Sequence, residues 1–199
     1  KTASTVVTPL DDILPTVTAK SSSTVTLNSA GQGTLTALEA HDASSDVCGV
    51  SLSLSQTAFT CADLGTRSLV LTATDPSGNS AQDLIPVTIS DSILPSVAAK
   101  SPFTINLDST GSRTISSSDV HESSSDNCGS VTLSVSPSTF GCADTGVQTV
   151  TLTASDGSSN TASDTVAVTV ADDEVPTVSA KASLSVNLDA SGSAIITAA

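Results

Sequence analysis

A ten-residue string occurs three times in this 199-residue chain, and its spacing constrains the fold more than any other feature. The copies are Asp11–Lys20, Asp91–Lys100 and Asp172–Lys181, and their prolines lie 80 and then 81 residues apart. A fixed period of this kind is typical of a tandem array, with the string as the joint between units. We therefore expect a segment of a longer protein in four parts: the end of a preceding repeat at 1–10, repeats at 11–91 and 92–172, and the truncated start of a third at 173–199.

The composition predicts a thin hydrophobic core in each repeat. The chain has no Trp, Tyr or Met and only three Phe, so Val, Leu, Ile and Ala supply nearly all of its apolar side chains. Units of about 80 residues with so few large side chains are marginally stable unless a disulfide or a metal supports them. We expect such a support in each repeat.

The formal net charge of −14 excludes two classes of partner. Binding to nucleic acid requires clustered Lys and Arg that neutralise phosphates, and an anionic lipid surface attracts basic segments rather than acidic ones. No apolar run reaches the roughly 20 residues of a transmembrane helix. We therefore expect no nucleic-acid partner and no membrane insertion of this segment.

Apolar and polar residues alternate through each repeat, which predicts β-strands with one buried face. The clearest run carries Leu69, Leu71 and Ala73, and a turn at 75–79 follows it. Short alternating strands between Gly, Asn and Asp turns predict an all-β sandwich, and no helical period accompanies them. Pro86 cannot donate a ladder hydrogen bond, so its strand is expected at a sheet edge.

The joints at both ends of a repeat require its termini to lie at opposite poles, which means an odd number of strand passes. The alternation makes five passes evident. The stretch at 59–65 admits a further hairpin, which would raise the number to seven.

Each complete repeat has two cysteines in equivalent places, Cys48 with Cys61 and Cys128 with Cys142. This pattern predicts one disulfide within each repeat and an oxidising compartment, whereas two thiols without a CxxC pair make a poor metal site. Closing a loop of about 14 residues would stabilise a repeat by about 3 kcal/mol. The two Cα atoms must come within about 7 Å, which favours seven passes over five. Reduced, buried cysteines are the alternative.

Three stretches carry a resemblance to a known family: 124–129 (SSDNCG), 140–146 (FGCADTG) and 72–79 (TATDPSGN). The chain resembles the hyalin-repeat (HYR)-type, immunoglobulin-like tandem repeats of giant bacterial cell-surface adhesins, especially those of gliding Bacteroidota. The resemblance covers both complete repeats and the partial third. It implies an immunoglobulin-like sandwich, extracellular display, and a role in adhesion or gliding.

Acidic residues gather around each joint, because the long polar loop and the 75–79 turn are expected at the same pole as the start of the repeat. Calcium takes six to eight oxygen ligands from carboxylates, carbonyls and water, whereas Asp is also a common turn former in solvent. Both interpretations stay open, since the spacing matches no known calcium loop. The candidate ligands are Asp11, Asp12, Asp42, Asp46 and Asp75 at the first joint, Asp91, Glu122, Asp126 and Asp156 at the second, and Asp172 at the third.

The functional prediction is a structural one. Neither a GxSxG elbow nor an HExxH motif occurs, so we do not expect an enzyme. We expect a stalk of a large extracellular adhesin, with neighbouring repeats of the same chain as partners and Ca²⁺ at the joints as the only candidate cofactor. The alternatives are a self-assembling fibre or surface-layer component, in which other copies of the chain would be partners, and a spacer in a secreted multidomain enzyme.

Overall fold

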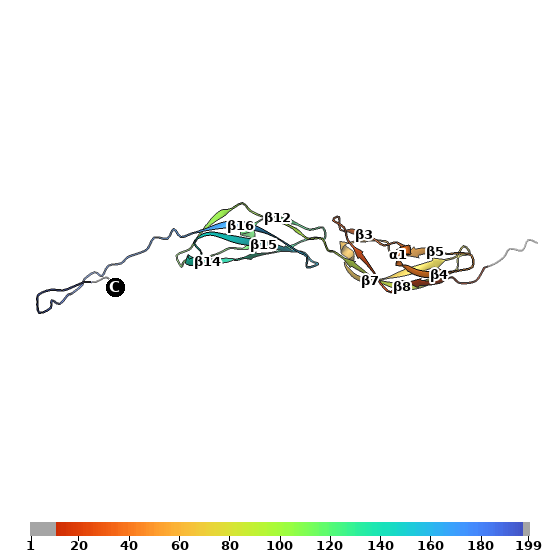
Figure 1. Cartoon of the computed structure of the whole chain (residues 1–199), viewed down its shortest axis with the longest axis horizontal. Coiled ribbons are helices and arrows are strands. Elements are labelled where there is room, and N and C mark those ends of the chain that lie inside the picture. Colours follow the sequence, from red (N-terminus) through yellow and green to blue (C-terminus); the bar gives the residue numbers. More distant parts are fainter. Residues whose placement is uncertain (1–10, 197–199) are drawn as a thin grey trace, which may run out of the picture.

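A computed structural model describes residues 11–196, and Figure 1 shows two β-rich units arranged end to end along one axis. Each unit contains eight strands, a one-turn α-helix and a short 3₁₀ helix (η) in the same order. The first unit comprises β1 (Thr16–Ala19), β2 (Ser23–Thr26), β3 (Gln32–Thr34), α1 (Ala37–Ala40), β4 (His41–Ser45), β5 (Ser51–Leu54), β6 (Ala58–Thr60), η1 (Cys61–Asp63), β7 (Gly65–Thr74) and β8 (Ser80–Ser90).

The second unit repeats this plan. It comprises β9 (Ser96–Ala99), β10 (Phe103–Asn106), β11 (Ser112–Thr114), α2 (Ser117–Val120), β12 (His121–Ser125), β13 (Thr132–Ser136), β14 (Thr139–Gly141), η2 (Cys142–Asp144), β15 (Gly146–Ser155) and β16 (Thr161–Ala171). The predicted remnant of a preceding repeat at 1–10 lies outside the described residues. From Asp172 to Ile196 the described chain forms no strand and is exposed.

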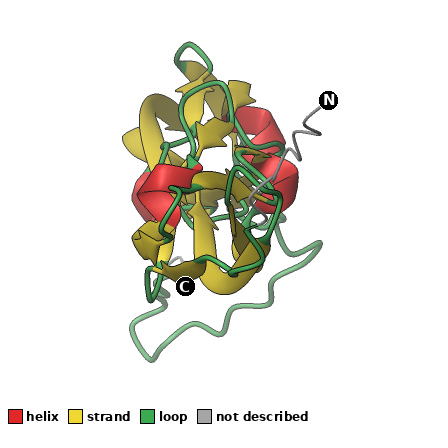
Figure 2. Cartoon of the chain, turned by 90° about the vertical axis from the view of Figure 1, so that its right-hand side faces the viewer, coloured by secondary structure: helices red, strands yellow, loops and turns green. Residues whose placement is uncertain are grey.

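Each unit is an immunoglobulin-like β-sandwich, which confirms the predicted fold class. A four-stranded sheet with the order β2-β8-β7-β5 forms one layer, and the pairs β1-β4 and β3-β6 form the other. The second unit has the same order, with β10-β16-β15-β13 in one layer and β9-β12 and β11-β14 in the other. Within each large sheet, the pairing of β2 with β8 and of β10 with β16 is parallel, and the other pairs are antiparallel. Figure 2, which looks along the molecule, shows that strands make up most of both units and that the helices are short.

The chain crosses each unit five times, and the seven-pass prediction was wrong. Strands β1 and β2 share the first pass, β3 and β4 the second, and β5 and β6 the third, while β7 and β8 each make a full pass. β5 and β6 run in the same direction but belong to different layers. The chain therefore changes layer between Leu54 and Ala58 without turning back, and it reverses only once at 59–65, through η1 into β7, so no further hairpin forms there.

Strand β8 is not an edge strand, which corrects the prediction made from Pro86. β8 lies between β2 and β7. The parallel pairing with β2 begins only at Val87, opposite Ser23, so Pro86 has β7 as its only paired neighbour. β8 is thus paired on both sides from Val87 to Ser90, but only on the β7 side at Pro86.

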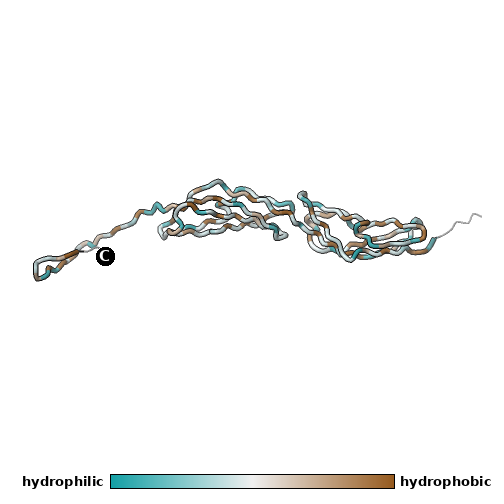
Figure 3. The backbone as a smooth tube through the Cα atoms, viewed as in Figure 1, coloured by the Kyte–Doolittle hydropathy of each residue, from teal (hydrophilic) through white to brown (hydrophobic). Residues whose placement is uncertain are grey.

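The core of each unit is small and aliphatic around one fully buried aromatic ring, and the half-buried Phe103 packs against the core of the second unit. Phe59 and Phe140 are 1% and 2% exposed, and Val, Leu and Ile side chains from both layers surround them. Figure 3 shows apolar and polar residues alternating along the strands, as a half-buried sheet requires. Within residues 11–196, no helix has the length and hydrophobicity needed to cross a lipid bilayer.

Candidate functional site

A disulfide joins the two units, and its position corrects the prediction of one disulfide within each repeat. Cys61 of the first unit is bonded to Cys128 of the second, with the Cα atoms 5.2 Å apart and a sequence separation of 67. Cys48 and Cys142 are exposed and have no disulfide partner among the described residues.

The strand passes explain why the pairing runs between units. One pass, made of β5 and β6, separates Cys48 from Cys61. A single pass carries the chain from one pole of the sandwich to the other, so these two cysteines lie at opposite ends of the first unit. Cys61 therefore lies at the joint, where the loop that carries Cys128 meets it.

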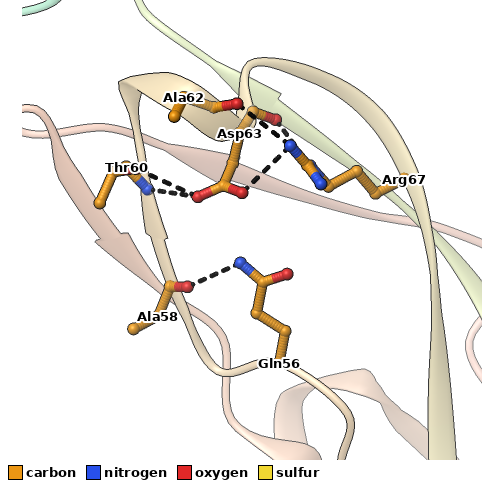
Figure 4. Close-up of polar contacts among 6 residues, drawn as sticks. All are labelled: Gln56, Ala58, Thr60, Ala62, Asp63 and Arg67. Carbon is orange, nitrogen blue, oxygen red and sulfur yellow. Dashed lines mark hydrogen bonds and ion pairs between the residues drawn. The ribbon is translucent and has the colours of Figure 1, made fainter.

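A network of hydrogen bonds fixes the backbone that presents Cys61, and Figure 4 shows it. Asp63 accepts hydrogen bonds from the Thr60 backbone N–H at 2.8 Å and from the Thr60 hydroxyl at 3.2 Å. The Arg67 guanidinium lies 3.1 Å from Asp63 Oδ1 and donates to the carbonyl oxygens of Ala62 and Asp63. The N–H of Thr60 is the main cause that holds the pKa of Asp63 below its ordinary value. Together these contacts close η1 into a rigid turn.

Asn127 makes the polar contacts that accompany the disulfide. Its amide nitrogen donates to the Asn28 carbonyl of the first unit and to Asp91 Oδ1 of the linking string, both at 3.2 Å. The backbone carbonyl oxygen of Asn127 lies 3.4 Å from Cys61 Sγ. Asn127 thus contacts both units and the string between them.

Three predicted calcium ligands come together at this joint. Asp91, Asp126 and Asp156 each direct one carboxylate oxygen into a space where the three atoms lie within 4.8 Å of one another. Asp91 is 8% exposed and Asp156 is 9% exposed, so most of their surface is withdrawn from water. Three carboxylates this close repel one another unless a proton or a cation neutralises them.

Several oxygens of this cluster have no hydrogen-bond partner within the described part of the chain. They are Asp91 Oδ2 and Asp126 Oδ1, and Oδ1 of Asn127, whose amide nitrogen contacts Asp91, is in the same state; all three are buried. Their companion oxygens are satisfied, since Asp126 Oδ2 accepts from the Cys128 N–H at 2.8 Å and Asp91 Oδ1 from the Ile93 N–H at 3.1 Å. Buried polar atoms are almost always partnered in folded proteins, so these three oxygens call for a partner such as a cation or a water molecule.

The start of the first unit repeats half of this arrangement. Asp11 and Asp46 again lie together, with Cys48 in place of a third carboxylate, and Asp11 Oδ2 and Asp46 Oδ1 again have no partner among the described residues. A hydrogen bond to Asp11 and the charge of that carboxylate raise the pKa of the Cys48 thiol. Val47, which stands where the second unit has Asn127, is exposed.

Two of the predicted ligands also close turns, and one of them is the Asp156 of the cluster described above. Asp75 and Asp156 close the turns at the ends of β7 and β15. Burial by itself would raise their pKa, but hydrogen bonds from Asn79 and Asn160 outweigh it and lower the pKa of both. Four further predicted ligands are exposed and belong to neither acidic cluster of the described residues: Asp12, Asp42, Glu122 and Asp172.

The two equivalent histidines begin β4 and β12, opposite Ala19 and Ala99, and each contacts a serine of its own strand. His41 Nε2 lies 2.9 Å from the Ser44 hydroxyl, and His121 Nε2 lies 3.0 Å from that of Ser124. Sequence reasoning missed Asn127 and Gly31, whose roles depend on the opposite unit. The only sequence signal for them is the pass count, which places 28–31 and 126–128 at one joint.

No protein-family model matches this chain, and no curated protein sequence matches it. Solved structures of chains with several domains in tandem resemble it weakly. Human mucin-like protocadherin EC1-2 is 14% identical, with 79% of this chain and 98% of that chain covered and a TM-score of 0.35. Sidekick-1 immunoglobulin domains 1–4 are 13% identical, with 79% and 48% covered and a TM-score of 0.44. Fibronectin(III)-like modules of Clostridium thermocellum CbhA are 13% identical, with 84% and 100% covered and a TM-score of 0.33. Such values establish no common function.

Proposed function

We propose that this chain is a load-bearing spacer of an extracellular stalk, with the segments at 11–91 and 92–172 as its repeating units. The observation that carries the proposal is the Cys61–Cys128 disulfide across the joint. A disulfide that persists requires an oxidising environment, which supports an extracellular location. Sandwiches joined end to end contact mainly their neighbours, so repetition adds length without a new fold.

The disulfide changes how the chain carries tension. A force applied at the two ends passes through the Cys61–Cys128 bond and bypasses the residues from 62 to 127. The bypassed segment contains β7 and β8 of the first unit and β9 to β12 of the second. These strands cannot be pulled out while the bond is intact, so the joint keeps its length under load.

Single-molecule stretching tests this role. We expect the fully unfolded chain to be about 230 Å longer after reduction than before, because a sequence separation of 67 is released at about 3.5 Å per step. The Cys128→Ser variant should show the longer length without reductant. A gain of only about 95 Å would indicate two bonds within the repeats, and no gain would indicate free thiols; either result contradicts the proposal.

We also propose that Ca²⁺ binds at the joint between Asp91, Asp126 and Asp156. The cluster supplies hard oxygen ligands, which Ca²⁺ prefers, and three buried oxygens that lack a partner within the described chain. The ligands come from the linking string, the loop before Cys128 and the β15–β16 turn. An ion held by all three would resist bending of the joint.

Calorimetric titration with CaCl₂ tests the calcium site. We expect a binding heat that Asp126→Asn reduces and that Glu122→Gln leaves unchanged, because Glu122 is exposed and outside the cluster. We also expect chelation to lower the melting temperature, since a ligand that binds only the folded state stabilises it. A titration without heat, or equal heats for the two variants, would overturn this assignment while leaving the disulfide unaffected.

The finer role that we propose is adhesion or gliding by a bacterial surface protein, and it rests on the resemblance to HYR-type repeats described above. The two sandwiches joined end to end and their acidic surface suit a stalk that holds a binding region away from the cell. Antibodies raised against this segment should label intact cells of the source organism without permeabilisation. Labelling only after lysis would contradict this role.

A further inference from the structure

Cys142 is presented in the same way as Cys61, although it has no partner among the described residues. Each cysteine opens a 3₁₀ helix at the far pole of its unit. Cys61 Sγ lies 3.7 Å from the carbonyl oxygen of Gly31, and Cys142 Sγ lies 3.7 Å from that of Gly111. The local structure around Cys142 is therefore that of a cysteine that is bonded elsewhere in this molecule.

The polar contacts behind the two cysteines also match. Asp144 Oδ2 accepts from the Gly141 N–H at 2.8 Å, as Asp63 Oδ2 does from Thr60. Gln148 donates to the Asp144 carbonyl at 2.9 Å, in the place where Arg67 donates to the carbonyl of Asp63. The rigid turn that presents the thiol is thus conserved between the two units despite different side chains.

The other cysteine of each unit lies at the opposite pole, and the two units hold it in the same way. The Cys128 N–H donates to Asp126 at 2.8 Å, and the Cys48 N–H donates to Asp46 at 2.7 Å. Cys48 is exposed, as Cys142 is. We call the cysteine at the end of a unit (Cys61 or Cys142) its donor cysteine and the cysteine at the start of a unit (Cys48 or Cys128) its receiver cysteine. The Cys61–Cys128 disulfide pairs one cysteine of each kind.

We propose that Cys142 bonds to the receiver cysteine of a following unit of this kind, and Cys48 to the donor cysteine of a preceding one. Disulfides would then run as a ladder along the array, one at each joint. Each bond forms by exchange with the disulfide of an oxidised disulfide oxidoreductase: the two thiols give up two protons and two electrons, and the disulfide of the oxidoreductase becomes a dithiol. The inference rests on the tandem arrangement in the proposed function and extends it to thiols that the structure leaves unpaired among its described residues.

A ladder would make each unit nearly inextensible. With both disulfides formed, the shortest covalent path through the second unit would run from Cys128 to Cys142. This path has about 14 residues and a fully extended length of about 50 Å. The longest strand, β16, has 11 residues and spans about 37 Å at 3.4 Å per residue. Because the two lengths are similar, tension cannot unravel a unit while both of its disulfides are intact.

An extended chain tests the ladder. Residues 173–199 align with 92–118, so a copy of residues 119–172 placed after Ala199 completes a third unit and adds a copied Cys128. The copied Cys142 is changed to Ser, which leaves one new receiver and no new donor. After oxidative refolding, alkylation and digestion without reduction, we expect a linked peptide pair that joins Cys142 to the copied Cys128.

The same digest contains its own control. The Cys61–Cys128 peptide pair reports whether the original joint has formed, so a failure of the proposed stalk and a failure of the ladder are distinguishable. Changing the copied Cys128 to Ser should return Cys142 to the alkylated form. If Cys142 is alkylated in the extended chain while Cys61 and Cys128 are bonded, or if it links to a second molecule, the ladder is wrong.

Discussion

At the scale of single residues, one aspartate in each unit ties the first strand to the last. Asp83 in β8 accepts from the Ala19 N–H at 2.8 Å, and Asp164 in β16 accepts from the Ala99 N–H at 2.9 Å. These backbone N–H groups are the main cause that lowers the pKa of both carboxyls. The sequence shows only an acidic residue in a strand, so this role could not be predicted from it.

The lowered pKa of Asp83 predicts a loss of stability in acid. A carboxylate whose pKa is lower in the folded state contributes stability above its ordinary pKa of about 3.9, and this contribution disappears as the pH falls through the folded value. We expect Asp83→Asn to lower the melting temperature at pH 7, and the difference from the wild type to shrink as the pH is lowered from about 5 to about 2. The exposed Asp42→Asn variant is the control, and a difference that stays constant with pH would contradict the assignment.

Gly31 lies where a side chain would collide with the joint. A Cβ at this position would lie 2.6 Å from Cys61 Sγ and 3.0 Å from the Asn127 carbonyl oxygen, and its φ of +69° is one that Ala adopts at a cost of about 1–2 kcal/mol. We expect Gly31→Ala to reduce the yield of the Cys61–Cys128 bond. Gly78→Ala shares the positive φ but meets no atom within 4 Å, so it should lower stability without affecting the bond. Equal bond yields in both variants would show that the close approach is unimportant.

At the scale of the elements, the alternation of apolar and polar residues predicts the strands but not the two α-helices. Alternation places Leu69, Leu71 and Ala73 on the buried face of β7, as the structure has them. The helix α1 has only four residues, too few for a helical period, but Thr36 and Glu39 form the capping box that is its sequence signature. A helix this short is thus predicted by its capping residues rather than by a helical period of apolar residues.

The layer of each strand was the part that the sequence did not determine. β5 and β6 read as one alternating run with a break, and nothing in their residues says that the break is a change of layer. Pro86 illustrates the same point, because its missing N–H requires an unpaired position and not an edge strand. Such choices depend on contacts with strands distant in sequence, which local patterns do not encode.

Phe59 should be the most sensitive core position of the first unit. It is 1% exposed and is the only aromatic side chain in its cluster of described residues. Phe→Ala in a buried site typically costs 3–5 kcal/mol, which is a large share of the stability of a unit of about 80 residues. We expect Phe59→Ala to give two calorimetric transitions, with the first unit melting at the lower temperature. Phe103→Ala, at a half-buried position, should cost less, and equal losses would contradict this view of the core.

At the scale of the whole molecule, the repeat and the five passes together determine the joint. An odd number of passes places the end of one unit beside the start of the next, and it separates the two cysteines of a unit by one pass. The acidic residues that meet at the joint followed correctly from this reasoning, as Asp91, Asp126 and Asp156 show. The disulfide did not, because equivalent cysteines in a repeat suggest an internal bond unless the pass between them is counted.

The most direct test of the account is the disulfide map of the unreduced chain. Alkylation followed by digestion should give one linked pair, Cys61 with Cys128, and alkylated Cys48 and Cys142. The intact mass should be lower than that of the reduced chain by two hydrogens. Two linked pairs within the repeats, Cys48 with Cys61 and Cys128 with Cys142, and a loss of four hydrogens would contradict a covalent joint between the units.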